Sequence, residues 1–256
     1  MIITLAQVGT FFLIVARIAG LFQFAPIFND RQIMLLGKAS LVIWLSFIFV
    51  FVIPLPKNFP DTQLSFVLAL LIEFLIGLLM GFTTQLVLIG IEFAGSLMDT
   101  QAGLSAASLL DPSTGHQTTL FSKWLRWIVV IMFFTLNGHH MILTTLSRSF
   151  KAIPIASYPR VDLGANYLVS LAGYIFSLGV QFAISIILIV FLIDFMFGML
   201  SKVAPQVNVF QLGFQVKPIV SCLIFLLIVP GLIYKMVEVI NQIIEYLLHL
   251  FLIMQG

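Results

Sequence analysis

Long runs of hydrophobic positions, separated by short polar stretches, divide the sequence into six apolar segments. A helix that crosses a bilayer needs about 20 predominantly apolar residues. The pattern therefore predicts an all-α, membrane-associated protein built from long, kinked helices and helical hairpins. The apolar segments cover residues 5–24, 39–53, 64–97, 124–146, 163–200 and 219–254.

The lengths of these segments do not fit six ordinary crossings of a flat bilayer. Residues 163–200 alone would form a helix about 57 Å long, whereas the hydrocarbon core is about 30 Å thick. Two explanations stay open: other subunits cover the excess apolar surface, or the helices bend at weak points. The candidate weak points are Gly77, Gly81, Gly90, Gly173, Gly179 and the pair Pro230 and Gly231.

The composition favours an integral membrane protein over a soluble protein with an unusually apolar core. Of the 256 residues, 61% are hydrophobic and 9% are charged, and the mean hydropathy is +1.16. A net charge of +2 is too small to indicate nucleic-acid binding. The single cysteine, Cys222, cannot form a disulfide within the chain. Because the N-terminal segment lacks a basic start, we expect an uncleaved helix rather than a signal peptide.

Four ionisable residues lie inside the apolar segments: Arg17, Glu73, Glu92 and Asp194. Each would cost about 2.5–3.5 kcal/mol at the centre of a lipid-facing helix, so we expect all four to face protein or water. A proton or ion relay is one interpretation. Pairing at a subunit interface, or a position near a helix end, is the favoured one, because the four positions share no helical spacing.

Two short motifs have weaker signals. His139 and His140 in "NGHH" are adjacent, so on a helix they point about 100° apart and do not converge on one metal ion. We therefore expect a helix break or an interface there rather than a metal site. Gly77 and Gly81 have the GxxxG spacing that permits close approach of two helices. The sequence shows no arrangement typical of an enzyme, and we predict no catalytic residues, cofactor or metal.

Two polar stretches interrupt the apolar pattern more strongly than the rest. The first, "GLSAASLLDPSTGHQT" at residues 103–118, combines small residues with the turn-forming Asp111, Pro112 and Gly115. It fits a loop that plugs a pore about as well as an ordinary connector, because irregular backbone at membrane depth must be buried in protein or line a cavity. The second, residues 201–218, carries Lys202, Lys217 and four amide side chains. It fits a polar hairpin tip at the membrane face, or a hydrated constriction.

The distribution of these features divides the chain in two. Residues 1–162 hold four uneven apolar segments and the first polar stretch. Residues 163–256 hold two long apolar arms joined by residues 201–218, which predicts one long helical hairpin.

Four stretches of the sequence resemble the FliR family of flagellar export-gate proteins, called SctT in virulence-associated type III secretion systems. They are "ARIAGLFQFAPIF" from Ala16, "DTQAGLSAASLLDPSTG" from Asp99, "NGHHMILTTLSRSFKAIP" from Asn137 and "APQVNVFQLGFQVK" from Ala204. The resemblance covers essentially the whole chain. Lys202 stands where many relatives are expected to have Arg, which is a conservative difference.

The resemblance implies a fold and a set of partners. A FliP-like part (residues 1–162) would be fused to a FliQ-like hairpin (residues 163–256). The chain would assemble with FliP-like and FliQ-like subunits, and with FlhB-like and FlhA-like proteins, at the flagellar basal body in the bacterial inner membrane. This hetero-oligomer would pass unfolded flagellar proteins across the membrane, without nucleic acid and without cofactor.

The resemblance also implies roles for the two polar stretches. The first would plug the closed pore, through Leu104, Ser105, Ala106, Ala107, Ser108, Leu109, Leu110, Asp111 and Pro112. The second would form a gate loop at the cytoplasmic entrance, through Lys202, Pro205, Gln206, Asn208, Phe210, Gln211 and Lys217.

Two alternative functions stay open at this point. A small-molecule secondary transporter with discontinuous helices would need internal repeats and a substrate site near the bilayer midplane, and the two halves show no repeat. A pure assembly scaffold would hold the same partners without lining the pore.

Overall fold

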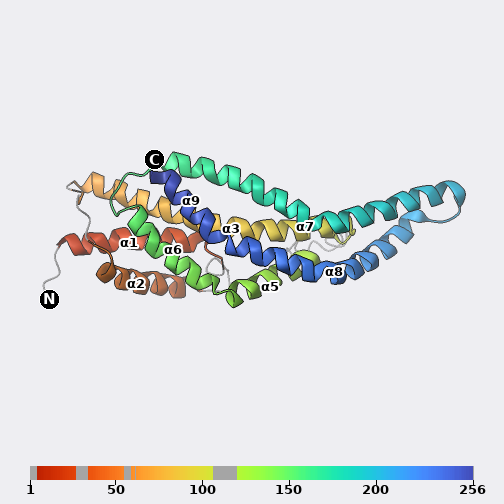
Figure 1. The fold of residues 1–256 in the computed structure, drawn as a ribbon, viewed down its shortest axis with the longest axis horizontal. Helices are drawn as coiled ribbons and strands as arrows, with labels where there is room; N and C mark the ends of the chain where they lie inside the picture. Colours follow the sequence, from red (N-terminus) through yellow and green to blue (C-terminus); the bar gives the residue numbers. More distant parts are fainter. Residues whose placement is uncertain (1–4, 27–33, 55–58, 61, 106–119, 256) are drawn as a thin grey trace. The chain divides into compact units, whose positions relative to one another are not determined.

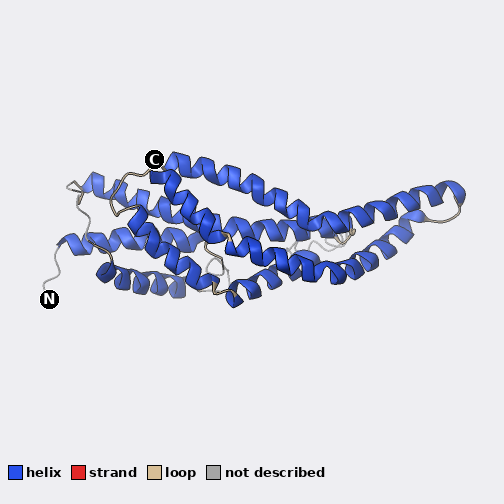
Figure 2. Cartoon of the chain, viewed as in Figure 1, coloured by secondary structure: helices blue, strands red, loops and turns tan. Residues whose placement is uncertain are grey.

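The structure is a computed structural model that describes residues 5–26, 34–54, 59, 60, 62–105 and 120–255. Within these ranges every regular element is a helix, and no strand occurs (Figure 2). The predicted all-α fold of long helices is therefore confirmed.

Eight helices follow one another in the described residues (Figure 1). The first apolar segment forms α1 with the predicted bounds, and the third and fifth form the two longest helices, α3 and α7, with 39 and 43 residues. The helices are α1 (Leu5–Phe24), α2 (Leu35–Val52), α3 (Gln63–Gln101), α5 (Leu120–Thr135), α6 (Gly138–Ala152), α7 (Val161–Val203), α8 (Val209–Asn241) and α9 (Ile243–Gln255).

The fourth apolar segment breaks where the "NGHH" motif predicted. α5 ends at Thr135, and α6 begins at Gly138. Between them Asn137 has a φ of 56°, in the left-handed region that Asn adopts more readily than most residues. The expected helix break is therefore confirmed.

The sixth apolar segment forms two helices, and the first of them begins earlier than predicted. α8 begins at Val209, ten residues before the expected start at residue 219, so most of the second polar stretch is helical. Pro218 and Pro230 both lie inside α8. A break comes at Gln242, between α8 and α9, and the bend expected at Pro230 and Gly231 remains a prediction. Proline is tolerated inside membrane helices where neighbouring groups satisfy the freed carbonyl, so composition alone does not locate the interruption.

Five of these helices are long and apolar enough to cross a membrane, and a sixth span results if the broken pair α5 and α6 counts as one. The surface of α2 illustrates the consequence. Leu35 and Leu36 are each about 80% exposed, and Trp44, Phe47 and Phe51 are also exposed. Side chains of this size and polarity are stable on a surface that lipid or another protein covers.

The chain forms two compact units. Unit 1 comprises Met1–Val87, Asn137–Ala172 and Asn241–Gly256, and unit 2 comprises Leu88–Leu136 and Gly173–Ile240. The proposed boundary between a FliP-like and a FliQ-like part, at residues 162 and 163, remains a prediction.

In unit 1, α1 and α3 approach each other closely at glycine residues. A Cβ atom added to Gly77 would lie 1.9 Å from the carbonyl oxygen of Arg17, and one added to Gly81 would lie 2.5 Å from that of Leu21. On the facing helix, a Cβ on Gly20 would lie 2.2 Å from the carbonyl oxygen of Phe74. These distances confirm that the GxxxG spacing marks a close helix crossing.

The C-terminal helix is fastened to the same unit by three hydrogen bonds. The Arg160 amide donates to the Met254 carbonyl at 3.0 Å, and the Tyr167 hydroxyl donates to the Tyr246 carbonyl at 3.3 Å. The Gln255 side chain donates to the carbonyl of Ala152, at the end of α6. α9 is therefore bound both to α6 and to the start of α7.

In unit 2, small residues and aromatic rings hold the helices together. A Cβ on Gly90 would lie 2.3 Å from the Cγ2 atom of Ile175, and Phe93 packs edge-on against Phe176 with 4.9 Å between ring centroids. The rings of Phe121 and Phe225 are also 4.9 Å apart. These contacts join the end of α3 to α7 and the start of α5 to α8.

Candidate functional site

The start of the first polar stretch is an ordered helix cap. Gly103 has a φ of +78°, which favours glycine because it has no Cβ. The amide of Gly103 donates to the Thr100 carbonyl at 3.2 Å, and the amide of Leu104 donates to the Asp99 carbonyl at 3.0 Å. This pair of bonds is the Schellman motif that ends many helices, so α3 stops at a defined residue.

Asp99, on the last turn of α3, joins this cap to the start of α5. Its Oδ1 atom accepts the amide of Phe121 at 2.9 Å, and its Oδ2 atom accepts the amide and the hydroxyl of Ser122 at 2.9 and 3.0 Å. Asp99 has no exposed surface. The first amides of a helix lack partners within the helix, and a carboxylate at that end is favourable for its dipole. Asp99 therefore caps a helix that begins 21 positions later in the sequence.

Most of the predicted plug lies outside the described residues. Leu104 and Ser105 are described and are both half-buried. The Ser105 and Thr100 hydroxyls lie 3.3 Å apart. The predicted plug residues outside the described ranges are Ala106, Ala107, Ser108, Leu109, Leu110, Asp111 and Pro112.

Only residues 204–208 of the second polar stretch form the hairpin tip, and the rest of the stretch is helical. α7 ends at Val203, residues 204–208 connect, and α8 begins at Val209. Asn208 caps α8, because its Oδ1 atom accepts the amide of Gln211 at 3.2 Å. The remaining predicted gate residues are spread over the end of α7, the tip and the start of α8, and they are Lys202, Pro205, Gln206, Phe210 and Lys217.

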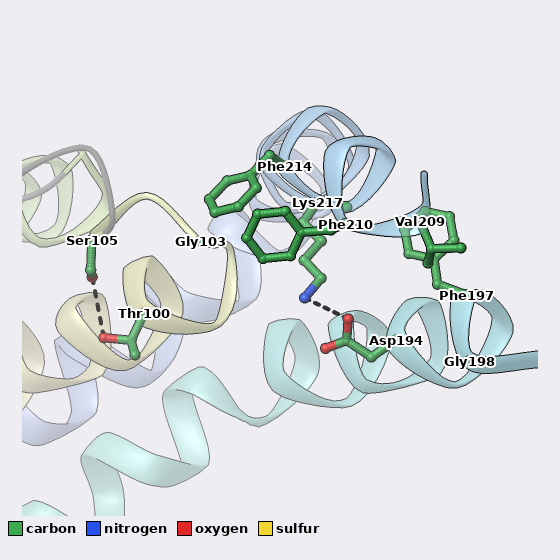
Figure 3. Close-up of a pocket in the computed structure, with 11 residues that line it drawn as sticks. Thr100, Gly103, Ser105, Asp194, Phe197, Gly198, Val209, Phe210, Phe214 and Lys217 are labelled. Atoms are coloured by element: carbon green, nitrogen blue, oxygen red, sulfur yellow. Dashed lines mark hydrogen bonds and ion pairs between the residues drawn. The ribbon is translucent and has the colours of Figure 1, made fainter. Parts of the chain in front are cut away.

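An ion pair crosses the hairpin behind this tip. The Lys217 Nζ atom of α8 lies 2.5 Å from the Asp194 Oδ1 atom of α7 (Figure 3). Phe210 and Phe214 pack edge-on one turn apart on α8, with 4.9 Å between ring centroids. The side chain of Asp194 is 49% exposed and that of Lys217 is 23% exposed. The pair is therefore partly accessible to solvent.

One cavity of about 600 Å³ brings the two polar stretches together within unit 2 (Figure 3). The end of α3 contributes Thr100, Gly103 and Ser105. The α7–α8 hairpin contributes the rest of the wall, namely Asp194, Phe197, Gly198, Val209, Phe210, Gly213, Phe214 and Lys217. Segments that are about 100 residues apart in the sequence therefore face one shared space.

The cavity wall is chemically simple. Its polar groups are two hydroxyls and one ion pair, and most of the remaining wall is aromatic or glycine. Among the described residues no group of three or more His, Cys, Asp and Glu side chains is placed to hold a metal ion. His139 and His140 lie in unit 1, with 4.3 Å between their ring centroids.

The other charged residues flagged in the sequence also have partners within the chain. Arg17 and Glu73 are almost fully buried in unit 1, with 2.6 Å between Arg17 Nε and Glu73 Oε2. Glu92 and Arg126 form a longer, half-exposed pair in unit 2, with 3.5 Å between Arg126 Nε and Glu92 Oε1. Arg17, Glu73, Glu92 and Asp194 therefore each face an opposite charge from another helix.

Comparison with known proteins identifies the family. Residues 8–243 match the family described as bacterial export proteins, family 1. The chain belongs to this export-protein family. Both polar stretches, residues 103–118 and 201–218, lie within the matched region.

Three relatives illustrate the range of this export-protein family. Flagellar biosynthetic protein FliR of Pectobacterium carotovorum is 31% identical over 223 residues, which cover 87% of this chain and 85% of the relative. FliR of Bacillus subtilis (strain 168) is 26% identical over 231 residues, or 89% and 88% of the two chains. Yop proteins translocation protein T of Yersinia pestis is 29% identical over 182 residues, or 69% and 70%. The resemblance to FliR and SctT proteins is therefore confirmed.

Sequence reasoning missed Asp99 and several residues of the cavity wall, namely Thr100, Phe197, Gly198, Val209, Gly213 and Phe214. Asp99 stands inside a stretch that carries the resemblance to this export-protein family, but it was not singled out. Its partners are two main-chain amides and a serine hydroxyl, which no spacing rule connects to it. The available signal was an acidic residue in the last turn of a helix, where the helix dipole disfavours it.

Proposed function

We propose that this bacterial export protein is a non-enzymatic subunit of the type III export apparatus and lines the conduit for unfolded flagellar proteins. Membership of the bacterial export protein family supports the export role. Relatives named flagellar biosynthetic protein FliR support flagellar substrates. The helices long and apolar enough to span a membrane support a place in the bacterial inner membrane, at the flagellar basal body.

The observation that carries the conduit role is the shared cavity in unit 2. Ser105 of the predicted plug lines the same cavity as Phe210 and Lys217 of the predicted gate loop. The shared wall supports a common role for the two polar stretches.

The proposal extends to partners and internal architecture. Residues 1–162 correspond to a FliP-like part, and residues 163–256 to a FliQ-like hairpin. FliP-like and FliQ-like subunits complete the conduit, and FlhB-like and FlhA-like proteins join at its cytoplasmic side. α7, with 43 residues, exceeds what a hydrocarbon core about 30 Å thick can cover at about 1.5 Å per residue. Neighbouring subunits covering the excess account for that length.

Energy for transport comes from elsewhere in the apparatus in this proposal. The conduit binds no cofactor and performs no reaction; it opens when the plug moves aside. The charged pairs hold the helices together rather than carry protons.

Deletion of residues 105–113 tests the sealing role of the first polar stretch. We expect membranes that contain the variant complex to become leaky to small ions, while some export of flagellar proteins continues. Ion permeability of inverted vesicles, with and without the deletion, measures the effect. Unchanged permeability in a complex that still assembles would contradict the plug.

A crosslinking experiment separates a conduit from a scaffold. A cysteine at position 109 or 110, in a Cys222→Ser background, should trap an export substrate that is arrested in transit. A cysteine at exposed Tyr158, outside the cavity, is the matched control. Trapping at neither loop position would favour the scaffold. Uptake of a small molecule without any trapped polypeptide would favour a secondary transporter.

A further inference from the structure

The first turns of α5, in unit 2, gather positive charge and indole rings on one exposed side of the helix. Lys123, Arg126 and Trp127 are exposed and stand at spacings of three and four residues, which share one side of a helix. Trp124 is also exposed and lies one turn before Trp127. We call these four residues the α5 patch.

The α5 patch offers many hydrogen-bond donors and few acceptors. An ammonium has three N–H groups, a guanidinium has five and an indole has one, and none of these groups accepts a hydrogen bond. Glu92 of α3 is the acidic neighbour of the patch, with its Oε1 atom 3.5 Å from Arg126 Nε. Because Nε carries only one of the five guanidinium donors, the others stay open to a ligand. The charges of Lys123 and Arg126 against that of Glu92 leave one net positive charge.

Packing beneath the α5 patch holds one of its indoles in place. The ring centroid of Trp124 lies 5.6 Å from that of Phe225 on α8 and 6.2 Å from that of Phe121. Phe121 and Phe225 are both buried, whereas Trp124 is 40% exposed. The exposed side of this indole therefore has a fixed position, which lowers the entropy that a bound ligand must overcome.

The exposed surface of α5 becomes purely apolar beyond the α5 patch. Ile131 and Phe134 follow Trp127 by four and seven residues on the same side of the helix, and both are exposed. Trp is enriched where lipid headgroups meet acyl chains, because its ring is apolar and its N–H is polar. Lys and Arg bind phosphate groups through charge-assisted hydrogen bonds. A bilayer presents the same order of chemistry, first phosphate and then acyl chain.

We propose that the α5 patch binds the headgroup of an anionic phospholipid, whose acyl chains lie along Ile131 and Phe134. Every phospholipid offers phosphate oxygens to the donors of the patch. An anionic phospholipid also has a net negative charge, which complements the net positive charge of the patch. This inference goes beyond the conduit and does not depend on it, because it requires only that the chain lies in the inner membrane.

Lipid titration of the full chain in its assembled complex tests the charge preference of the site. The complex is stripped of lipid in detergent, and native mass spectrometry measures the dissociation constants of phosphatidylglycerol and phosphatidylcholine. Lys123→Gln and Arg126→Gln should each weaken binding of phosphatidylglycerol about fivefold and leave that of phosphatidylcholine nearly unchanged. Arg148→Gln, which removes an exposed cation from α6, is the matched control and should bind both lipids as the native chain does. Native binding of phosphatidylglycerol in the double variant Lys123→Gln with Arg126→Gln would overturn the inference.

The indole N–H groups should affect the two lipids in a different way. Trp124→Phe and Trp127→Phe keep an aromatic ring and remove the donor. Each should weaken the binding of phosphatidylglycerol and phosphatidylcholine by a similar factor, about two- to tenfold, because both lipids carry the phosphate. Unchanged binding of both lipids in the double Phe variant would show that the patch does not hold a headgroup, and would overturn the inference.

Two further measurements distinguish a lipid from the other ligands that a cationic patch attracts. Glycerol 1-phosphate, an anionic headgroup without acyl chains, should not displace phosphatidylglycerol at equal concentration. Displacement would identify a site for free anions and overturn the inference. A photoreactive maleimide attached to Trp127→Cys, in a Cys222→Ser background, should crosslink to lipid in native membranes. Crosslinking to another protein subunit instead would identify a protein interface and would also overturn the inference.

Discussion

Arg17 on α1 and Glu73 on α3 form a buried ion pair, with 2.6 Å between Arg17 Nε and Glu73 Oε2. Arg17 Nη1 also donates to the carbonyl of Ile153 at 3.0 Å, and its guanidinium carbon lies 4.4 Å from the centre of the Phe150 ring. Glu73 Oε1 accepts the amide of Ala156 at 3.0 Å. The two charges therefore tie α1, α3 and the turn after α6 into one network.

Removal of one member of this pair should destabilise unit 1 strongly. Arg17→Ala or Glu73→Ala leaves a buried charge without its partner, which typically costs about 3–5 kcal/mol. We expect either variant to lower the midpoint of thermal unfolding in detergent and the amount of protein in the membrane. Replacing both residues with apolar ones of similar volume, Arg17→Met with Glu73→Leu, should recover much of the loss because no unpaired charge remains.

The exposed Arg148 on α6 provides the control for this experiment. Arg148→Ala removes the same charge from the surface of unit 1 and should change the midpoint little. If Arg17→Ala were as mild as Arg148→Ala, the buried network would not be a source of stability.

The close crossing of α1 and α3 predicts that alanine at Gly77 destabilises the protein, whereas alanine at Gly173 does not. A Cβ on Gly77 would meet the Arg17 carbonyl oxygen at 1.9 Å, whereas one on Gly173 of α7 has no atom within 4 Å. Gly77→Ala should therefore force the helices apart and lower the unfolding midpoint. Gly173→Ala should leave it unchanged or stabilise the protein by up to about 1 kcal/mol. Equal effects of the two substitutions would show that α1 and α3 do not pack at Gly77.

The sequence pattern predicted helix bounds correctly where an apolar run ends with the helix. It predicted them incorrectly where a helix carries polar residues. α1 has its predicted bounds because its ends coincide with the ends of an apolar run. α8 begins ten residues early because Gln211 and Gln215 were interpreted as a loop, although they lie on an exposed helical surface. Exposed amides are compatible with a helix or a loop, so polarity alone did not locate this boundary.

Several individual residues of the site could be predicted from the sequence, but the contacts between them could not. Asp194 and Lys217 were both singled out, but their pairing depends on how the two arms of the hairpin align. Arg17 and Glu73 are 56 positions apart, and only the helix crossing brings them together. Asp99 has partners on the main chain, which is the same at every residue. Contacts of that kind carry no signal in a single sequence.

Removal of the Asn208 cap should destabilise only the first turn of α8 and leave the rest of the helix intact. Asn208→Ala removes the acceptor for the Gln211 amide and should cost about 1 kcal/mol of helix stability. Asn208→Asp keeps an acceptor at the helix start and should be at least as stable as the native residue. Hydrogen exchange of the amides of residues 209–212 measures the stability of this helix start in both variants. Equal protection in the native protein and in Asn208→Ala would mean that the side chain does not cap the helix.

The ion pair across the hairpin gives a prediction that separates a structural pair from a proton relay. Because Asp194 is 49% exposed, solvent screens its attraction to Lys217. A double-mutant cycle with Asp194→Asn and Lys217→Gln should give a coupling energy of about 0.2–1 kcal/mol, and the coupling should weaken as salt rises toward 1 M. Unfolding midpoints of the purified protein measure it.

Exchange of the two charges completes this test. In a structural pair, the double variant Asp194→Lys with Lys217→Asp should restore stability and export toward native levels, because the attraction is symmetric. A relay that passes protons through a carboxylate at position 194 would not be restored by moving that carboxylate to α8. Loss of export in the exchanged variant, with normal stability and assembly, would therefore favour the relay over the pair.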